Sequence, residues 1–382
     1  MYPQRIAALA GALGVLACTV FAAPVSAHPD ASPYVVVLAT GTPAGQVAVR
    51  AAALARRYGA VPGRSFTAGL AAFAVTMPPV AAARMAGDPS VAYLTPDRAV
   101  DLAGTESPAP SWGLDRVDQR PRRLSGSYGY PAGGGAGVTV YVLDTGIRTS
   151  HADFGGRARY GWDFIGDDAN ASDCNGHGTH VAGTVGGTRY GVAKRVRLVS
   201  VRVLDCRGRG SYSQIIAGID WITAHAVRPA VVNMSIEGPA AAVLDDAVRR
   251  SVAAGITFVV AAGNHRRNAC TESPARTPQA LTVGATDRSD ARASFSNYGR
   301  CVDLFAPGAA IASDWNSGDR ARALMSGTSM AAPHVAGAAA LLLSGHPRWT
   351  PAQVRAALVA AATRGKVARA GAGSPNLLLY TR

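Results

Sequence analysis

The chain has 382 residues, of which 48% are hydrophobic and 16% charged, and its formal net charge is +14 at pH 7. This composition excludes a mainly disordered chain, and the length suffices for one large domain and a smaller one. The arginines are scattered and have no interleaved aromatic residues, which argues against nucleic-acid binding and indicates a solvated basic surface.

The first 27 residues have the pattern of an export signal. Arg5 supplies a positive charge, residues 6–21 form an apolar stretch, and residues 25–27 form a small-residue cleavage site. The apolar stretch is shorter than the roughly 20 residues that a membrane-spanning helix needs. We therefore expect a secreted protein that lacks a membrane span; an uncleaved anchor is the alternative.

Residues 28–104 predict a small α+β domain with its core in residues 33–100. Strands are expected over residues 34–39, 70–77 and 91–95, and they alternate with helices over residues 44–59 and 78–89. Residues 101–113 are rich in Pro, Ser and Gly, which is typical of a linker or a processing site.

Residues 105–382 predict an α/β domain with a doubly wound, mostly parallel sheet. Apolar, β-branched runs indicate buried strands over residues 138–144, 197–205, 230–236, 256–263 and 280–286. Helical patterns over residues 214–226 and 241–255 lie between them. In such a sheet, functional sites lie beyond the carboxyl ends of the strands.

Four cysteines remain after Cys18 is removed with the signal, and an even number in an oxidising compartment predicts two disulfides. They are Cys174, Cys206, Cys270 and Cys301. The sequence alone allows three pairings. Pairing in sequential order would close two short loops, each contributing about 3–4 kcal/mol in the chain-entropy view. Zinc binding is the alternative, but no C-x-x-C spacing supports it.

Three polar residues stand next to glycines at the ends of predicted elements. Asp144 ends a strand, whereas His177 and Ser329 each precede a helix. Serine becomes a nucleophile when a histidine takes its proton, and a buried carboxylate then holds the imidazole in the required tautomer. The chain order Asp, His, Ser is one of the known orders for this chemistry.

The neighbours of these residues suit the same chemistry. Asn264 follows a predicted strand and, with the backbone N–H of Ser329, would stabilise a developing oxyanion. We expect Gly176 and Gly178 to leave room for a substrate beside His177. Ser326 is expected to lie outside the reactive geometry.

Four motifs, "DTG", "NGHGTHVAG", "AAGN" and "GTSMAAPHVAG", resemble those of the subtilisin-like serine proteases. The segments "SDARASFSNYG" and "CVDLFAPG" are most similar to the proteinase K branch, in particular to aqualysin-type secreted enzymes. The resemblance covers residues 112–380, and its motifs occur in the order of the family.

The resemblance implies a subtilisin-like fold and a set of roles. Asp144 would orient His177, the base; Ser329 would be the nucleophile; and Asn264 would complete the oxyanion hole. Residues 33–100 resemble the family's inhibitory propeptide, so the protein would be a zymogen that cleaves itself near residues 103–106. Its partners would be protein or peptide substrates and its own propeptide, and we expect a monomer.

The resemblance also assigns residues to substrate binding and to the disulfides. Two segments would pair with an extended peptide, and a third would form a wall of the specificity pocket; their residues are Gly208, Gly210, Ser235, Gly238, Ala261 and Gly263. The cysteine positions match those of aqualysin-type enzymes, which supports the sequential pairing.

Glu237 departs from the family, which usually has glycine at this position. Its carboxylate would narrow the specificity pocket or attract a basic substrate side chain; alternatively, it points to solvent.

Calcium is implied at Asp303, together with the carbonyls of Pro278 and Ala280, since oxygen ligands suit calcium. The alternative is a surface Asp in a salt bridge. A second calcium site, at Asp115, Asp118 and Gln119, is expected to be weakened or lost. Pro121 and Gly126 stand where the relatives have further ligands.

Two other functions compete with the protease. An esterase of the α/β-hydrolase type would need G-x-S-x-G and a different residue order, and this chain has neither. A non-catalytic binding protein on the same fold is the remaining alternative.

Overall fold

The computed structural model describes residues 30–67, 71–97, 104–106 and 108–382. The chain divides into two compact units, Met1–Val100 and Asp101–Arg382. The predicted signal, residues 1–27, lies outside the described residues, as does residue 103 of the predicted processing region. Within the described ranges, no helix is long and apolar enough to cross a membrane.

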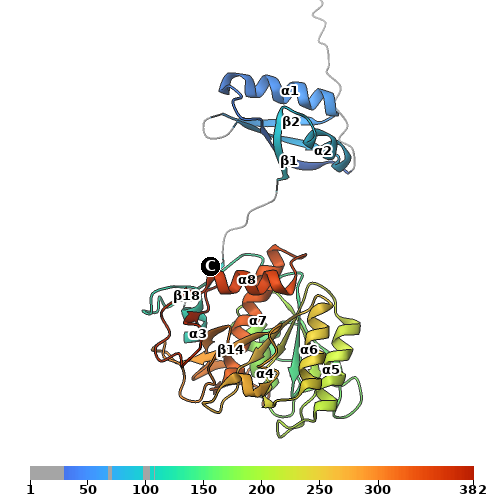
Figure 1. Cartoon of the computed structure of the whole chain (residues 1–382). Coiled ribbons are helices and arrows are strands. Elements are labelled where there is room, and N and C mark those ends of the chain that lie inside the picture. Colours follow the sequence, from blue (N-terminus) through green and yellow to red (C-terminus); the bar gives the residue numbers. More distant parts are fainter. Residues whose placement is uncertain (1–29, 68–70, 98–103, 107) are drawn as a thin grey trace, which may run out of the picture. The chain divides into compact units, whose positions relative to one another are not determined.

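The smaller unit is an antiparallel sheet with two helices (Figure 1). Its strand order is β2-β3-β1-β4. Fully buried side chains such as Val36, Phe73 and Met85 join sheet and helices in one core. The elements are β1 (Ser32–Leu38), α1 (Val47–Tyr58), β2 (Val61–Phe66), β3 (Ala72–Met77), α2 (Pro79–Ala86) and β4 (Val91–Pro96).

Strand β2 is an addition to the elements predicted from the sequence. It lies at the edge of the sheet and pairs only with β3 among the described strands. Most of its residues are exposed, and it contains Pro62 and Gly63. Proline and polar residues are tolerated on an edge strand, so β2 lacks the apolar pattern by which strands are recognised.

The larger unit contains a nine-stranded sheet in its described part, with the order β18-β19-β15-β14-β12-β10-β7-β9-β8. Every strand pair is parallel except β18 with β19. This confirms the predicted fold class. The strands are β7 (Thr139–Asp144), β8 (Ala158–Asp163), β9 (Arg197–Arg202), β10 (Ala230–Met234), β12 (Thr257–Ala261), β14 (Leu281–Thr286), β15 (Leu304–Pro307), β18 (Thr363–Arg364) and β19 (Leu377–Leu378).

Helices cover both faces of this sheet, as Figure 1 shows for α5 and α6 on one side and α7 on the other. Alternate residues of β7 enter different cores: Val140 and Val142 pack with α4 and α7, whereas Tyr141 and Leu143 pack with α5 and α6. The helices are α3 (Trp112–Val117), α4 (His177–Gly186), α5 (Tyr212–His225), α6 (Ala242–Ala253), α7 (Thr328–Gly345) and α8 (Pro351–Ala361).

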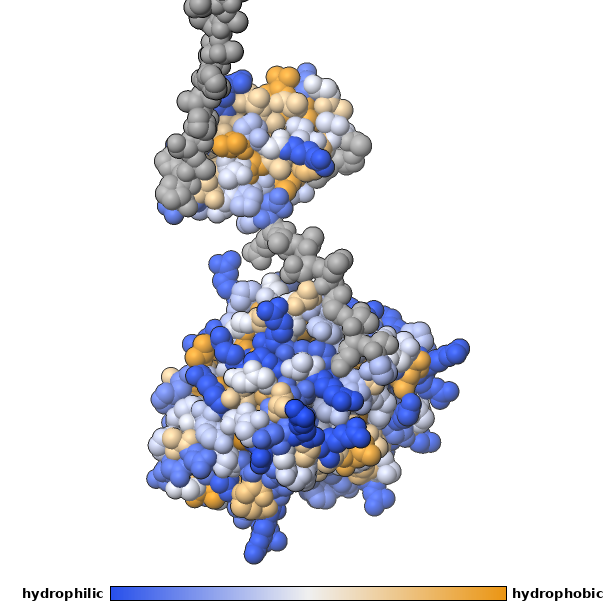
Figure 2. Space-filling view, turned by 180° about the vertical axis from the view of Figure 1, so that it is seen from behind, coloured by the Kyte–Doolittle hydropathy of each residue, from blue (hydrophilic) through white to orange (hydrophobic). Residues whose placement is uncertain are grey.

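Short two-stranded pairs complete the unit. They are β5 (Gly104–Glu106) with β6 (Tyr128–Tyr130), β11 (Gly238–Pro239) with β13 (Glu272–Ser273), and β16 (Ile311–Asp314) with β17 (Arg322–Met325). The face of the larger unit shown in Figure 2 is mostly hydrophilic, with small, scattered hydrophobic areas, in keeping with the solvated surface that the composition predicts.

The fold brings the predicted polar residues to one edge of the large sheet. Asp144 is the last residue of β7, and Asn264 follows β12 by three residues. His177 begins α4, and Ser329 is the second residue of α7. Of the 18 residues of α7, 14 are buried. Helix α7 can pass through the close-packed core because its side chains are small.

Candidate active site

Asp144 and His177 form a close contact at the end of β7. Oδ1 of Asp144 lies 2.7 Å from Nδ1 of His177 and also accepts the N–H of Thr145 at 2.7 Å. Asp144 is fully buried, whereas the His177 side chain is 20% exposed. A carboxylate oxygen can only accept a hydrogen bond, so Nδ1 carries the proton and Nε2 of a neutral ring is free to act as a base.

Burial and charge act in opposite directions on His177. Burial lowers the pKa of His177, but the charge and hydrogen bond of Asp144, helped by Asp173, raise it above the ordinary value of 6.5.

Asp173 holds the loop that carries His177, a role that the sequence analysis missed. Its Oδ1 accepts the N–H groups of Asn175 and Gly176 and the hydroxyl of Thr145. Its Oδ2 accepts both the N–H and the hydroxyl of Thr179 in α4. One carboxylate thus joins the end of β7 to the start of α4.

The glycines beside His177 serve protein packing and not substrate access, which corrects the expectation for Gly176 and Gly178. Gly176 has φ 116°, and a side chain there would collide with the indole of Trp315. A side chain on Gly178 would collide with the carbonyl of Gly146. The close approach at Gly178 brings α4 next to the end of β7.

Ser329 is held through its backbone while its side chain faces the cleft. Pro333 in α7 has no N–H to bond the carbonyl of Ser329, and this carbonyl accepts the hydroxyl of Ser235 at 2.9 Å instead. The Ser329 hydroxyl donates to the carbonyl of Ser235 at 3.3 Å. It is not hydrogen-bonded to His177 in this structure, but both residues line the same cleft.

Asn264 is fixed by the first turn of α7. Its Oδ1 accepts the N–H of Thr328 at 2.8 Å and the hydroxyl of Thr328 at 3.0 Å. The amide nitrogen is thereby left as a donor; it lies 3.4 Å from Oε1 of Glu237.

The cleft has a volume of about 860 Å³ and two backbone walls. Residues 207–212 form one wall and residues 235–239 the other, and the hydroxyl of Tyr212 donates to the carbonyl of Pro239 across them. Four of the predicted substrate residues line it: Gly208, Gly210, Ser235 and Gly238. Ala261 and Gly263 are buried, and the carboxylate of Glu237 lies against Gly263.

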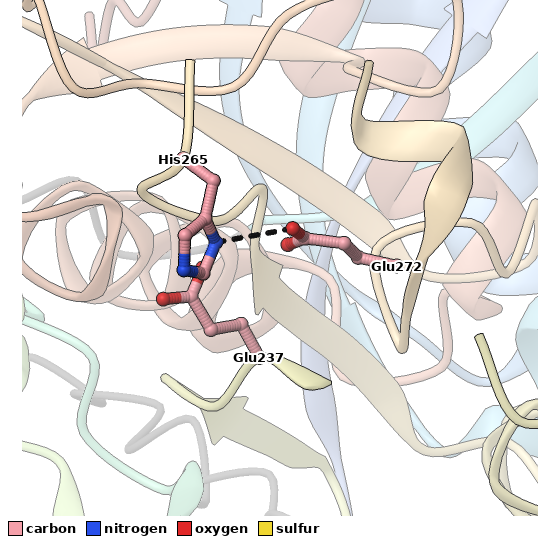
Figure 3. A group of neighbouring side chains, drawn as sticks. All are labelled: Glu237, His265 and Glu272. Atoms are coloured by element: carbon pink, nitrogen blue, oxygen red, sulfur yellow. Dashed lines mark hydrogen bonds and ion pairs between the residues drawn. The ribbon is translucent and has the colours of Figure 1, made fainter. Parts of the chain in front are cut away.

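Glu237, His265 and Glu272 point toward one another (Figure 3). Glu237 also contacts Asn264. The pairing of β11 with β13 brings Glu272 beside the segment of Glu237. Nδ1 of His265 lies 3.1 Å from Oε1 of Glu272 and 3.6 Å from Oε2 of Glu237. Burial raises the pKa of Glu237, an effect that the N–H of Asn264 opposes.

This group has residue types that ligate metals, and their ligand atoms lie within 4.8 Å of one another. However, Oε1 of Glu272 is already paired with the guanidinium of Arg267, and Oε2 accepts the amide of Asn297. Oε2 of Glu237 accepts the N–H of Asn264 at 2.6 Å. A metal ion would therefore have to displace Arg267.

The four cysteines that follow the predicted signal form disulfides in sequential order, Cys174–Cys206 and Cys270–Cys301. The first ties the loop before His177 to the loop before the 207–212 wall. The second ties the segment after Asn264 to the start of the turn before β15.

The residues expected to bind calcium are engaged by protein groups. Asp303 accepts the N–H of Thr282 through Oδ2 and is paired with the Arg355 guanidinium through Oδ1. Pro278 is exposed, and Ala280 is buried just before β14. The set does not fit calcium while Arg355 holds Asp303, because two cations would compete for one oxygen.

The expected second calcium site is likewise filled by protein donors. Asp115 accepts the N–H groups of Ser125 and Gly126, and Asp118 accepts that of Gly129 and pairs with Arg382. Gln119 donates to the carbonyls of Pro121 and Arg123.

The other polar residues near the motifs are structural. His180 bonds the carbonyl of Ile311 and His334 that of Met330, and burial lowers the pKa of each to about 4. Ser326 accepts the N–H of Ala310.

Residues 135–376 match the model of the Subtilase family. The chain belongs to the subtilase family. This subtilase is 57% identical over 316 residues to the extracellular serine proteinase of Thermus sp. (strain Rt41A), an alignment that covers 83% of this chain and 77% of the relative. It is 48% identical over 257 residues to proteinase T of Parengyodontium album, covering 66% of this chain and 86% of the relative.

A solved structure agrees with the family assignment. The crystal structure of a cold-adapted subtilisin-like serine proteinase superimposes with a TM-score of 0.69 at 50% sequence identity, covering 71% of this chain and 98% of that one. The predicted resemblance is thus confirmed, and this subtilase is a serine protease.

Replacing Asp173 with Ala should loosen the His177 loop. Five hydrogen bonds to its carboxylate are lost, so we expect kcat to fall on the order of 10²-fold and the thermal-unfolding midpoint to drop. Steady-state kinetics and calorimetry measure both. Asp246→Ala removes an exposed carboxylate and serves as control; equal behaviour of the two variants would contradict the role of Asp173.

Arg355 should decide whether calcium stabilises the protein. In a Ser329→Ala background, which avoids self-digestion, EDTA is expected to leave the unfolding midpoint nearly constant. The additional change Arg355→Ala frees Oδ1 of Asp303 and should make the midpoint rise with millimolar calcium. If EDTA lowers the unfolding midpoint of the Ser329→Ala protein that retains Arg355 by several degrees, calcium binds despite the arginine and the prediction is wrong.

Proposed function

We propose that this subtilase is a secreted serine endopeptidase that hydrolyses extended protein substrates through Ser329, His177 and Asp144. The observation that carries the proposal is the 2.7 Å contact of His177 with buried Asp144, in a cleft that Ser329 also lines. With Nδ1 bonded to Asp144, Nε2 takes the proton of Ser329, and Oγ attacks the peptide carbonyl.

The reaction requires the Ser329 hydroxyl to leave the carbonyl of Ser235. Rotation about the Cα–Cβ bond of Ser329 moves Oγ from the carbonyl of Ser235 toward His177, since catalytic hydrogen bonds often tighten only when substrate binds. The amide of Asn264 and the N–H of Ser329, in the first turn of α7, would receive the oxyanion. His177 then gives its proton to the leaving amine, and water hydrolyses the acyl-enzyme.

The two walls of the cleft suit an extended peptide. Gly208, Gly210, Ser235 and Gly238 would offer backbone groups to a substrate strand, and such pairing tolerates many sequences. Because of this mode of binding, we expect the enzyme to cleave many different proteins and not one particular peptide.

The remaining parts of the proposal concern maturation. Residues 28–104 would be a propeptide that assists folding and inhibits the site, with self-cleavage near residues 103–106. Support comes from its separate core and from its position before the family match, which begins at residue 135. Export is supported by the N-terminal pattern, the two disulfides and the extracellular relative.

Ser329→Ala should abolish proteolysis and maturation. The purified wild type should hydrolyse casein and label with a fluorophosphonate at Ser329, whereas the variant should do neither and should keep residues 28–104 attached. Gel electrophoresis and mass spectrometry measure both. A wild type that folds but neither labels nor cleaves would instead favour the non-catalytic binding protein.

The pH dependence of kcat/KM should report His177. Its pKa is raised above 6.5, and only the neutral ring accepts a proton, so activity should be lost as pH falls through a midpoint above 6.5. Asp144→Asn removes the charge that raises the pKa; the midpoint should fall and kcat should drop about 10⁴-fold. A midpoint that Asp144→Asn leaves in place would contradict the assignment.

A further inference from the structure

Glu237 is the acidic residue of the catalytic cleft: among the described residues that line it, no other carries a carboxylate. Its side chain is 26% exposed, and Oε2 lies 2.6 Å from where a Cβ on Gly263 would stand. The carboxylate therefore lies between the 235–239 wall and the segment expected to form the specificity pocket.

The position of Glu237 relative to the reacting atoms follows from its contacts with Asn264. The N–H of Asn264 donates to Oε2, and the side-chain amide lies 3.4 Å from Oε1. In the proposed mechanism this amide binds the oxygen of the carbonyl under attack. The substrate residue that owns this carbonyl then lies close to Glu237.

The charges around Glu237 are not balanced. Glu272 is buried and neutralised by Arg267, with Asn297 and His265 as further partners. Glu237 has only the amide groups of Asn264 and a half-exposed His265 at 3.6 Å. Within the described part of the chain, no arginine or lysine is ion-paired with Glu237.

From this geometry we infer that Glu237 makes the protease prefer substrates with Arg or Lys on the amino side of the cleaved bond. The inference rests on the proposed function and names its substrate class. A long basic side chain reaches the carboxylate and supplies the missing cation in a site partly shielded from water, where a charge-assisted hydrogen bond is strong. An apolar side chain would instead bury the carboxylate unpaired, which is costly.

The same carboxylate affects the chemical step. Negative charge beside Asn264 opposes the negative charge that develops on the carbonyl oxygen. A basic substrate side chain neutralises Glu237 and removes this opposition. The preference should therefore appear in kcat as well as in KM.

The first test uses the unaltered enzyme. Matched peptide amides carrying Arg, citrulline, Lys, norleucine or Phe before the cleaved bond are assayed at pH 8 with EDTA, so that no metal engages the Glu237 group. Citrulline has the shape of arginine without its charge. We expect kcat/KM to be at least about 10-fold higher for Arg than for citrulline and for Lys than for norleucine. Equal rates within each pair would overturn the inference.

The second test changes the enzyme. Glu237→Gln keeps the shape and removes the charge; it should lower the Arg-to-citrulline ratio about 10-fold or more and raise kcat for Phe. Glu237→Asp should retain part of the preference, and Asp246→Asn should retain all of it. Fluorophosphonate labelling at Ser329 shows that each variant has folded and matured.

The outcomes separate the two proposals. A wild type that cleaves none of the peptides and does not label refutes the protease function itself. A wild type that cleaves and labels, but whose Arg-to-citrulline ratio is the same in Glu237→Gln, refutes only the role of Glu237.

Discussion

The contact between Nδ1 of His177 and Oδ1 of Asp144 is the interaction on which the rest of the site depends. It fixes which nitrogen of the ring carries the proton, and hence which one faces the cleft as a base. Three features of the fold hold this contact in place. Asp144 is buried at the end of a central strand, Asp173 joins that strand to the helix of His177, and glycines let the two backbones approach. Each of these features helps to hold the His177 ring in one position.

The nucleophile is positioned by packing of a different kind. Helix α7 enters the core because its residues are small, and Pro333 leaves the carbonyl of Ser329 free for Ser235. Thr328, at the first residue of α7, binds the side-chain oxygen of Asn264 and so aims the amide nitrogen. Nucleophile and oxyanion donor are therefore set by the same helical turn, and a shift of α7 would misplace both.

The sequence predicted those parts of the fold that follow from local patterns. The buried strands β7, β9, β10, β12 and β14 were recognisable from apolar runs, and Asp144, His177, Ser329 and Asn264 from the glycines and strand ends beside them. Strand β2 was not predicted, because an exposed edge strand has no apolar pattern. Contacts between distant segments were also beyond reach. Asp303 meets Arg355 across 52 residues, and Glu272 reaches the neighbourhood of Glu237 only through the pairing of β11 with β13. Arg355 competes with the calcium ion that the family resemblance implies at Asp303. The carboxylate of Glu237 changes the specificity pocket that the same resemblance implies.

The most direct test of the account is a crystal structure of the mature enzyme inhibited by a peptide phosphonate. We expect a covalent bond from Ser329 Oγ to phosphorus. A phosphonyl oxygen should lie within about 3.1 Å of both the Asn264 amide and the Ser329 N–H, with Nε2 of His177 beside the bonded Oγ. A phosphonate attached elsewhere, or an Asn264 amide and a His177 ring that both remain apart from it, would contradict the central claim that these three residues act as one catalytic unit.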